Sequence, residues 1–123
     1  MGGAAATDEG YAAFYGARSP RIKPFTVLTA MASAAAGWIG IEHKLGGPCL
    51  TYSTACSSSA VAIGEAWLRI RSGAADVLLA GGAEAPLTPG TLKAWEALQT
   101  LAREDADDPA ASCKPFAADR CGL

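Results

Sequence analysis

Residues 50–60 carry the sequence LTYSTACSSSA, in which β-branched and aromatic residues give way to small residues and then to serines. Residues 49–54 have the length and composition of a short β-strand. From Cys56 onward, apolar residues recur at spacings of four and three and so share one helix face, at Cys56, Ala60, Ile63, Trp67 and Ile70. The sequence therefore predicts a strand that turns at Cys56 directly into a helix.

The predicted helix ends near Ser72. Arg69 and Arg71 favour the negative pole of the helix dipole, and Gly73 suits the left-handed position that closes a helix. Upstream, residues 26–45 are mostly small or apolar and are followed by Gly46-Gly47-Pro48, which predicts one tightly packed helix over that range.

The residues after this unit repeat the alternation of strand and helix. The apolar run at residues 77–80 predicts a strand covered on both faces, as in a parallel sheet. Thr88-Pro89 is typical of an N-cap followed by proline at the first helical position, and an apolar stripe follows at Leu92, Trp95, Leu98 and Leu101. Residues 103–111 are charged and predict a solvated loop. The order predicts the α/β class with a mostly parallel sheet.

Composition excludes several classes of function. The 123 residues suit one domain, and 10 basic against 12 acidic residues give no reason to expect a nucleic-acid partner. No apolar stretch approaches the roughly 20 residues that span a bilayer, and the N-terminus lacks the pattern of a secretory signal. We therefore expect a cytoplasmic protein with no membrane partner.

The four cysteines, at positions 49, 56, 113 and 121, are expected to be reduced thiols. The apolar composition indicates a core that needs no disulfide, unlike small secreted domains. With no Cys-x-x-Cys motif and His43 as the sole histidine, the sequence predicts no metal site.

Cys56 is the candidate nucleophile. At the start of a helix, unpaired backbone N–H groups and the positive end of the dipole favour a thiolate, and the same groups can stabilise an oxyanion during acyl transfer. A strand that turns through a nucleophile into a helix also has the geometry of the hydrolase elbow. The residues alone leave a second interpretation open, a small buried cysteine without a role.

Four motifs make the sequence recognisable in order and spacing: Gly47-Pro48, Thr54-Ala55-Cys56-Ser57-Ser58-Ser59, residues 75–84 (ADVLLAGGAE) and residues 114–122 (KPFAADRCG). Together they resemble the β-ketoacyl synthases, over about residues 18–123. The resemblance is to the discrete, carrier-dependent enzymes of fatty-acid, type II polyketide and aryl-polyene biosynthesis. It implies a partial thiolase-like fold, corresponding to an incomplete N-terminal synthase domain over residues 1–123.

The resemblance implies a mechanism in which Cys56 takes the acyl group from an acyl carrier protein and yields it to the carbanion of a decarboxylated malonyl carrier. No cofactor or metal is implied.

Thr26 and Trp95 match acyl-pocket positions, and full-length members form homodimers or heterodimers. His43 matches neither of the family's two catalytic histidines, which are expected beyond residue 123 together with a lysine and a glycine-rich oxyanion turn.

Three alternatives stay open. One is a non-catalytic partner subunit like the chain-length factors, although such partners usually lack the cysteine that is present here. A second is a truncated, inactive product, since we expect the 123-residue chain alone to acylate Cys56 at most, without turnover. The third is an interaction or redox module that uses Cys56 as a reactive thiol, which the absence of a nearby resolving cysteine disfavours.

Overall fold

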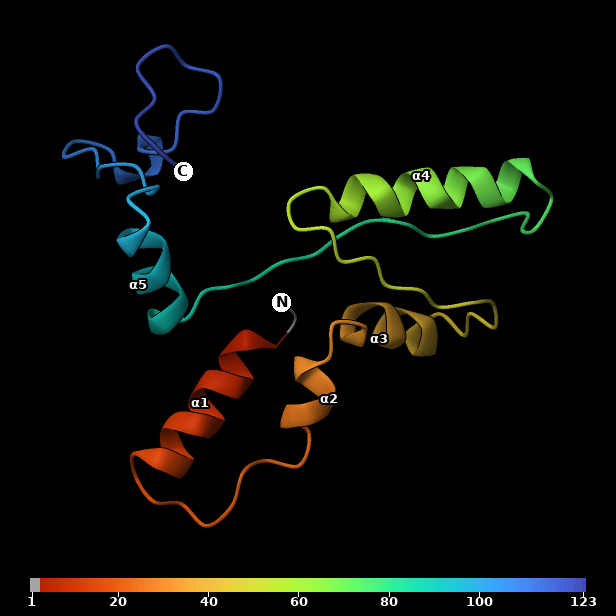
Figure 1. Cartoon of the computed structure of the whole chain (residues 1–123), viewed down its shortest axis with the longest axis horizontal. Helices are drawn as coiled ribbons and strands as arrows, with labels where there is room; N and C mark the ends of the chain where they lie inside the picture. The colour runs from red at the N-terminus through yellow and green to blue at the C-terminus, as the bar shows by residue number, and fades with distance from the viewer. Residues whose placement is uncertain (1–2) are drawn as a thin grey trace. The chain divides into compact units, whose positions relative to one another are not determined.

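The computed structural model describes residues 3–123, which separate into a first compact unit that ends at Ala85 and a second, Pro86–Leu123. Each unit is described by itself. The helices of the first unit are α1 (Ala4–Tyr15), α2 (Thr26–Ala30), α3 (Ala34–Glu42) and α4 (Ser58–Arg71) (Figure 1). The second unit contains α5 (Pro89–Ala97) and a short 3-10 helix, η1 (Pro109–Ala111).

Helix α1 is a feature that the sequence analysis did not predict. It packs against α2 and the loop before it. A Cβ atom at Gly10 of α1 would lie 3.3 Å from Cγ2 of Ile22 in that loop and 3.7 Å from Cγ2 of Thr26 in α2. Its alanines are strong helix formers, which is the signal that could have revealed it.

The helix predicted after Cys56 is confirmed with a shifted start. Helix α4 begins at Ser58, with Ser57 as its N-cap, so Cys56 precedes the helix rather than opening it. The predicted end is correct, since Ser72 is the C-cap and Gly73 has a left-handed φ of 75°. Near this end, the guanidinium carbon of Arg71 lies 4.6 Å from the ring centroid of Trp67, a cation–π contact.

The single helix predicted over residues 26–45 is wrong, because the structure divides this range into α2 and α3. Met31 has an extended backbone, with ψ 138°, and ends α2. Just before it, the hydroxyl of Thr29 donates to the carbonyl oxygens of Phe25 at 3.0 Å and of Thr26 at 3.1 Å. Such bonding of a side chain back to the preceding turn bends and weakens helices.

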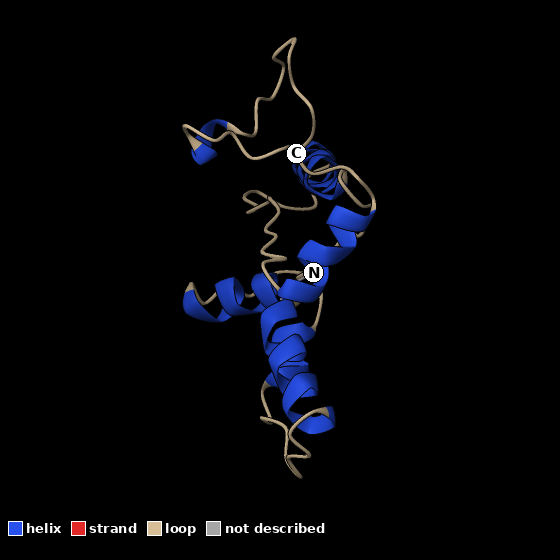
Figure 2. Cartoon of the chain, turned by 90° about the vertical axis from the view of Figure 1, so that its left-hand side faces the viewer, coloured by secondary structure: helices blue, strands red, loops and turns tan. Residues whose placement is uncertain are grey.

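The two predicted strands do not form within residues 3–123, where no β-strand is present (Figure 2). Residues 49–54 have no regular structure apart from an isolated bridge between Thr54 and Cys56. Residues 77–80 belong to a long stretch without helix or strand (Figure 1). A strand exists only where a neighbour pairs with its backbone, and neither range has such a partner here.

Apolar side chains throughout residues 3–123 remain accessible to solvent, and no hydrophobic residue among them is buried. In the predicted inner strand, Val77 is 86% exposed and Leu79 is 71% exposed. Large apolar side chains exposed in such number leave surface that other protein can cover. The core that the composition predicts is therefore not formed by the described residues alone.

The loop after α5 is confirmed as a polar, solvated segment apart from η1. The backbone N–H groups of Asp108 and Asp107 donate to Oδ1 of Asp105, at 3.2 and 3.1 Å, and hold the pKa of Asp105 below its ordinary value. The Lys114 ammonium, 3.2 Å from Oδ2 of Asp119, likewise lowers the pKa of that carboxyl.

Helix α5 begins as predicted, with Thr88 as N-cap and Pro89 at the first helical position. The Thr88 hydroxyl oxygen accepts from the backbone N–H of Thr91 at 3.3 Å and lies 2.9 Å from the Thr91 hydroxyl. Thr88 is only 4% exposed, so water does not replace these bonds easily. The cap is therefore the feature that fixes where α5 starts.

We predict that Thr88→Ala destabilises α5 by about 1 kcal/mol, since it removes the N-cap oxygen. Hydrogen exchange at the Thr91 amide, measured by NMR, should become faster, whereas Thr88→Ser keeps an oxygen and should stay close to the wild type. Equal exchange in the alanine and serine variants would contradict the capping role.

Candidate functional site

The candidate site is centred on residues 54–58, here called the cysteine turn. Ala55 has a left-handed backbone with φ 51°, which is uncommon for a residue other than glycine. Cys56 follows it and precedes the N-cap of α4. Strained backbone of this kind clusters at functional sites and persists only where its surroundings fix it.

The hydroxyls of two serines fix the cysteine turn. Ser57 Oγ donates to the carbonyl oxygen of Thr54 at 2.7 Å. Ser58 Oγ accepts from the backbone N–H of Thr54 at 2.9 Å and donates to the carbonyl oxygen of Ala55 at 2.7 Å. Cys56 is thereby held between bonded residues on both sides, while its own side chain stays exposed.

The same hydrogen bonds leave the start of α4 open. Ser57 is the N-cap, yet its hydroxyl bonds to Thr54 and makes no capping bond to the helix. The N–H groups of the first turn therefore lack a side-chain cap and can favour negative charge beside them. This arrangement suits an oxyanion that forms next to Cys56.

Thr26, the first predicted pocket residue, opens α2 and is 7% exposed. It lines an open, mostly apolar hollow of about 560 Å³ together with residues of α1 and α2 and of the loop between them, among them Tyr11, Val27 and Met31. Trp95, the second predicted pocket residue, lies in α5 and is 37% exposed, so its side chain is partly covered. Thr26 and Trp95 belong to different units.

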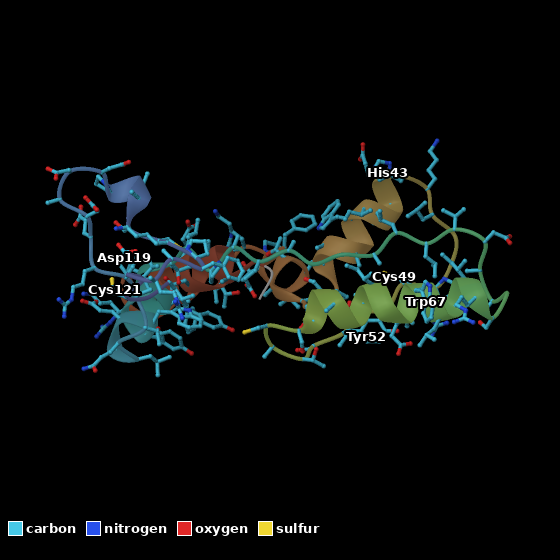
Figure 3. The ribbon with its side chains drawn as sticks, turned by 90° about the horizontal axis from the view of Figure 1, so that it is seen from above. His43, Cys49, Tyr52, Trp67, Asp119 and Cys121 are labelled. Atoms are coloured by element: carbon cyan, nitrogen blue, oxygen red, sulfur yellow. The ribbon has the colours of Figure 1, made fainter. Side chains whose placement is uncertain are left out.

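The other cysteines and the histidine lack the features of the cysteine turn. His43 is the C-cap of α3, and Cys49 lies in the stretch between α3 and α4 (Figure 3). In the second unit, Cys121 Sγ accepts from the backbone N–H of Arg103 at 3.5 Å. All four cysteines are free and exposed, so exposure does not single out Cys56.

Residues 3–123 contain no group of three or more histidine, cysteine or acidic side chains placed to hold a metal ion. Within the same range, every helix is too short or too polar to cross a bilayer.

The roles of Ser57 and Ser58 in the turn were not predicted from the sequence, where both serines were only part of the cysteine motif. A signal was available, since serine and threonine side chains commonly bond to nearby backbone and form turns and helix starts.

Comparisons with known proteins relate the chain to one family. The family described as "Beta-ketoacyl synthase, N-terminal domain" matches residues 1–123. Nodulation protein E of Rhizobium meliloti (strain 1021) is 41% identical over 123 residues, which cover 100% of this chain and 29% of that protein. 3-Oxoacyl-[acyl-carrier-protein] synthase 2 of the same strain is 41% identical over 103 residues, covering 84% of this chain and 24% of that protein.

The backbone of a solved ketosynthase structure is also similar to that of this chain. That structure is a type II PKS acyl-carrier protein in complex with its ketosynthase, bound to the hexaketide. One of its chains matches with a TM-score of 0.85 and 29% identity, covering 98% of this chain and 31% of that one. The fold is thus ketosynthase-like, of the thiolase-like type.

The chain therefore belongs to the β-ketoacyl synthase family, as its motifs indicate. The resemblance inferred from the sequence is confirmed. The chain spans between 24% and 31% of the length of the relatives described here.

We predict that Cys56 is the most reactive of the four thiols, because it alone combines the cysteine turn with an uncapped helix start. Limiting iodoacetamide on the folded protein, followed by peptide mass mapping, should label Cys56 first. Cys49, Cys113 and Cys121 are equally free and exposed, so they serve as internal controls. Preferential labelling of any of these three would contradict the prediction.

Proposed function

We propose that Cys56 is the nucleophile of a β-ketoacyl synthase, an acyltransferase that condenses an acyl thioester with a malonyl thioester. The cysteine turn is the main support for this proposal. It places an exposed thiol beside the uncapped start of α4, in a chain of this family. Nucleophilic catalysis requires an accessible, oriented thiolate, and the hydrogen bonds of Ser57 and Ser58 supply the orientation.

The reaction has two stages. The Cys56 thiolate attacks the thioester carbonyl, the carbon–sulfur bond to the carrier breaks, and the carrier leaves as a thiolate. The malonyl thioester then loses carbon dioxide, and the electron pair of the broken bond becomes a carbanion. The carbanion attacks the acyl carbonyl on Cys56, and the new carbon–carbon bond releases the Cys56 thiolate. First-turn N–H groups of α4 would stabilise the oxyanion in the acylation steps.

Acyl carrier protein is the proposed partner, as donor of both the acyl and the malonyl group. The ketosynthase complex similar to this chain contains such a carrier, which supports the proposal. Retention of Cys56 favours a catalytic subunit over a chain-length-factor-like partner. A homodimer or heterodimer of synthase subunits is proposed as the assembly, in line with the exposed apolar side chains.

We also propose that residues 49–54 and 77–80 are strands of a mostly parallel sheet in a synthase of full length. The apolar run of residues 77–80 supports this, since Val77 and Leu79 would be covered once neighbouring strands and helices pack on them. The family match over residues 1–123 supports one synthase domain that includes the whole chain.

Thr26 and Trp95 are proposed to line the acyl pocket. Thr26 supports this by lying beside an apolar hollow, and Trp95 by presenting a partly accessible ring on α5. An indole ring is large enough to set how long an acyl chain the pocket admits.

The proposed nucleophile is tested with Cys56→Ala in the protein that carries this chain. After incubation with acyl-carrier and malonyl-carrier proteins, the variant should carry no acyl group at position 56. Formation of β-ketoacyl product should fall at least about a thousandfold, because the covalent route is lost. Mass spectrometry of protein and product measures both.

Cys49→Ala is the matched control, since it removes an equally free and exposed thiol from the same unit. It should load and condense like the wild type. Product formation that survives Cys56→Ala would refute the proposed role.

The pocket is tested with Trp95→Ala, which should admit longer acyl chains because it removes the indole ring. Loading of Cys56 is measured with acyl-carrier substrates of graded length. Trp38→Ala in α3 makes the same change in size outside the proposed pocket and should keep the wild-type length profile. An unchanged profile in Trp95→Ala, with lowered thermal stability, would show that Trp95 only packs the core.

A further inference from the structure

Gly82 lies unusually close to the start of α4. Figure 1 shows the chain turning back after α4 and running beside the helix that it has just left. A Cβ atom at Gly82 would lie 2.0 Å from Oγ of Ser59 and 3.1 Å from its Cβ. Rotation of the Ser59 hydroxyl would relieve the contact with Oγ, but the contact with Cβ is tighter than most real Cβ contacts, so the start of α4 would have to shift by a few tenths of an ångström.

The requirement for glycine comes from space and not from backbone conformation. Gly3 and Gly73 are the described glycines with a left-handed backbone, and Gly82 is not among them. The neighbouring Gly81 has no atom within 4 Å of the place where its Cβ would be. The close approach is therefore specific to one of two adjacent glycines.

Ser59 connects this contact to the nucleophile. It is the second residue of α4 and directly follows Ser58, whose hydroxyl bonds to Thr54 and Ala55 on the far side of Cys56. A displacement of Ser59 would move the first turn of α4. It would then strain the hydrogen bonds that hold Cys56 between Thr54 and Ser58.

We propose that Gly82 is a positioning residue for Cys56. By lacking a side chain, it lets the segment after α4 lie against Ser59 and fixes the first helical turn behind the thiol. Gly82 touches neither substrate nor the reacting sulfur, and it acts through Ser59 and Ser58. The importance of this role for catalysis rests on the proposed function of Cys56, whereas the positioning itself does not.

The test compares three variants of the protein that carries this chain: Gly82→Ala, Gly81→Ala and the double variant Gly82→Ala/Ser59→Gly. The rate constant for labelling of Cys56 by iodoacetamide is measured by peptide mass mapping at one pH. It should fall about tenfold in Gly82→Ala, because a shifted first turn of α4 no longer presents its N–H groups to the sulfur of Cys56. Gly81→Ala adds the same methyl group into open space and should stay within about twofold of the wild type.

Ser59→Gly removes Oγ and Cβ of Ser59 and leaves its Cα, 3.6 Å from the new methyl group, at an ordinary contact distance. The double variant should therefore regain most of the lost rate. A role confined to general stability would not produce this recovery. The single variant Ser59→Gly completes the double-mutant cycle and measures the coupling between the two positions. If Gly82→Ala fails to fold, the double variant must restore both folding and labelling.

Equal labelling rates in Gly82→Ala and Gly81→Ala would overturn the inference. A loss that Ser59→Gly does not repair would overturn it as well. Acyl loading from a carrier protein is followed in parallel. A wild-type protein that is alkylated at Cys56 but takes no acyl group would refute the proposed function, while the labelling series would still decide the role of Gly82.

Discussion

Hydrogen bonding between serine side chains and the backbone of residues 54–58 is the constraint on which the candidate site depends. The bonds from Ser57 and Ser58 satisfy backbone groups that a regular strand or helix would otherwise have to satisfy. They hold Ala55 in a left-handed conformation and leave the cysteine side chain exposed at the bend. Because the hydroxyl of Ser57 serves the turn, the helix behind Cys56 keeps its positive end uncovered.

Around this well-defined turn, the described residues provide local structure without a core. The helices are set by local signals, such as the cap at Thr88 and the left-handed Gly73. The apolar surface of these helices and of residues 77–80 has no cover within residues 3–123. Local order at the cysteine turn is compatible with the absence of a core. Turns and caps need only neighbours in sequence, whereas sheets and cores need distant residues.

This difference between local and long-range contacts explains which features could be predicted from the sequence. The end of α4, the start of α5 and the family were predictable, because each depends on a few adjacent residues. The break at Met31 was not, since the residues around it are as compatible with one continuous helix as with two. The strands were expected from apolar runs, but pairing partners decide whether such runs become strands. Cys56 lies just before α4 because the serine hydroxyls bond to the backbone of the turn. The spacing of apolar residues carries no information about such hydrogen bonds.

The left-handed backbone at Ala55 restricts which sequences can occupy this turn during evolution or in a designed library. β-Branched and bulky residues are strained at such a φ, whereas glycine and asparagine adopt it readily. Alanine limits the freedom of the unfolded chain more than glycine does, but at a positive φ its strain exceeds this entropic gain, so glycine is the less strained choice at position 55. A library that varies this turn would therefore restrict position 55 to alanine, glycine and asparagine, and would place its larger substitutions elsewhere.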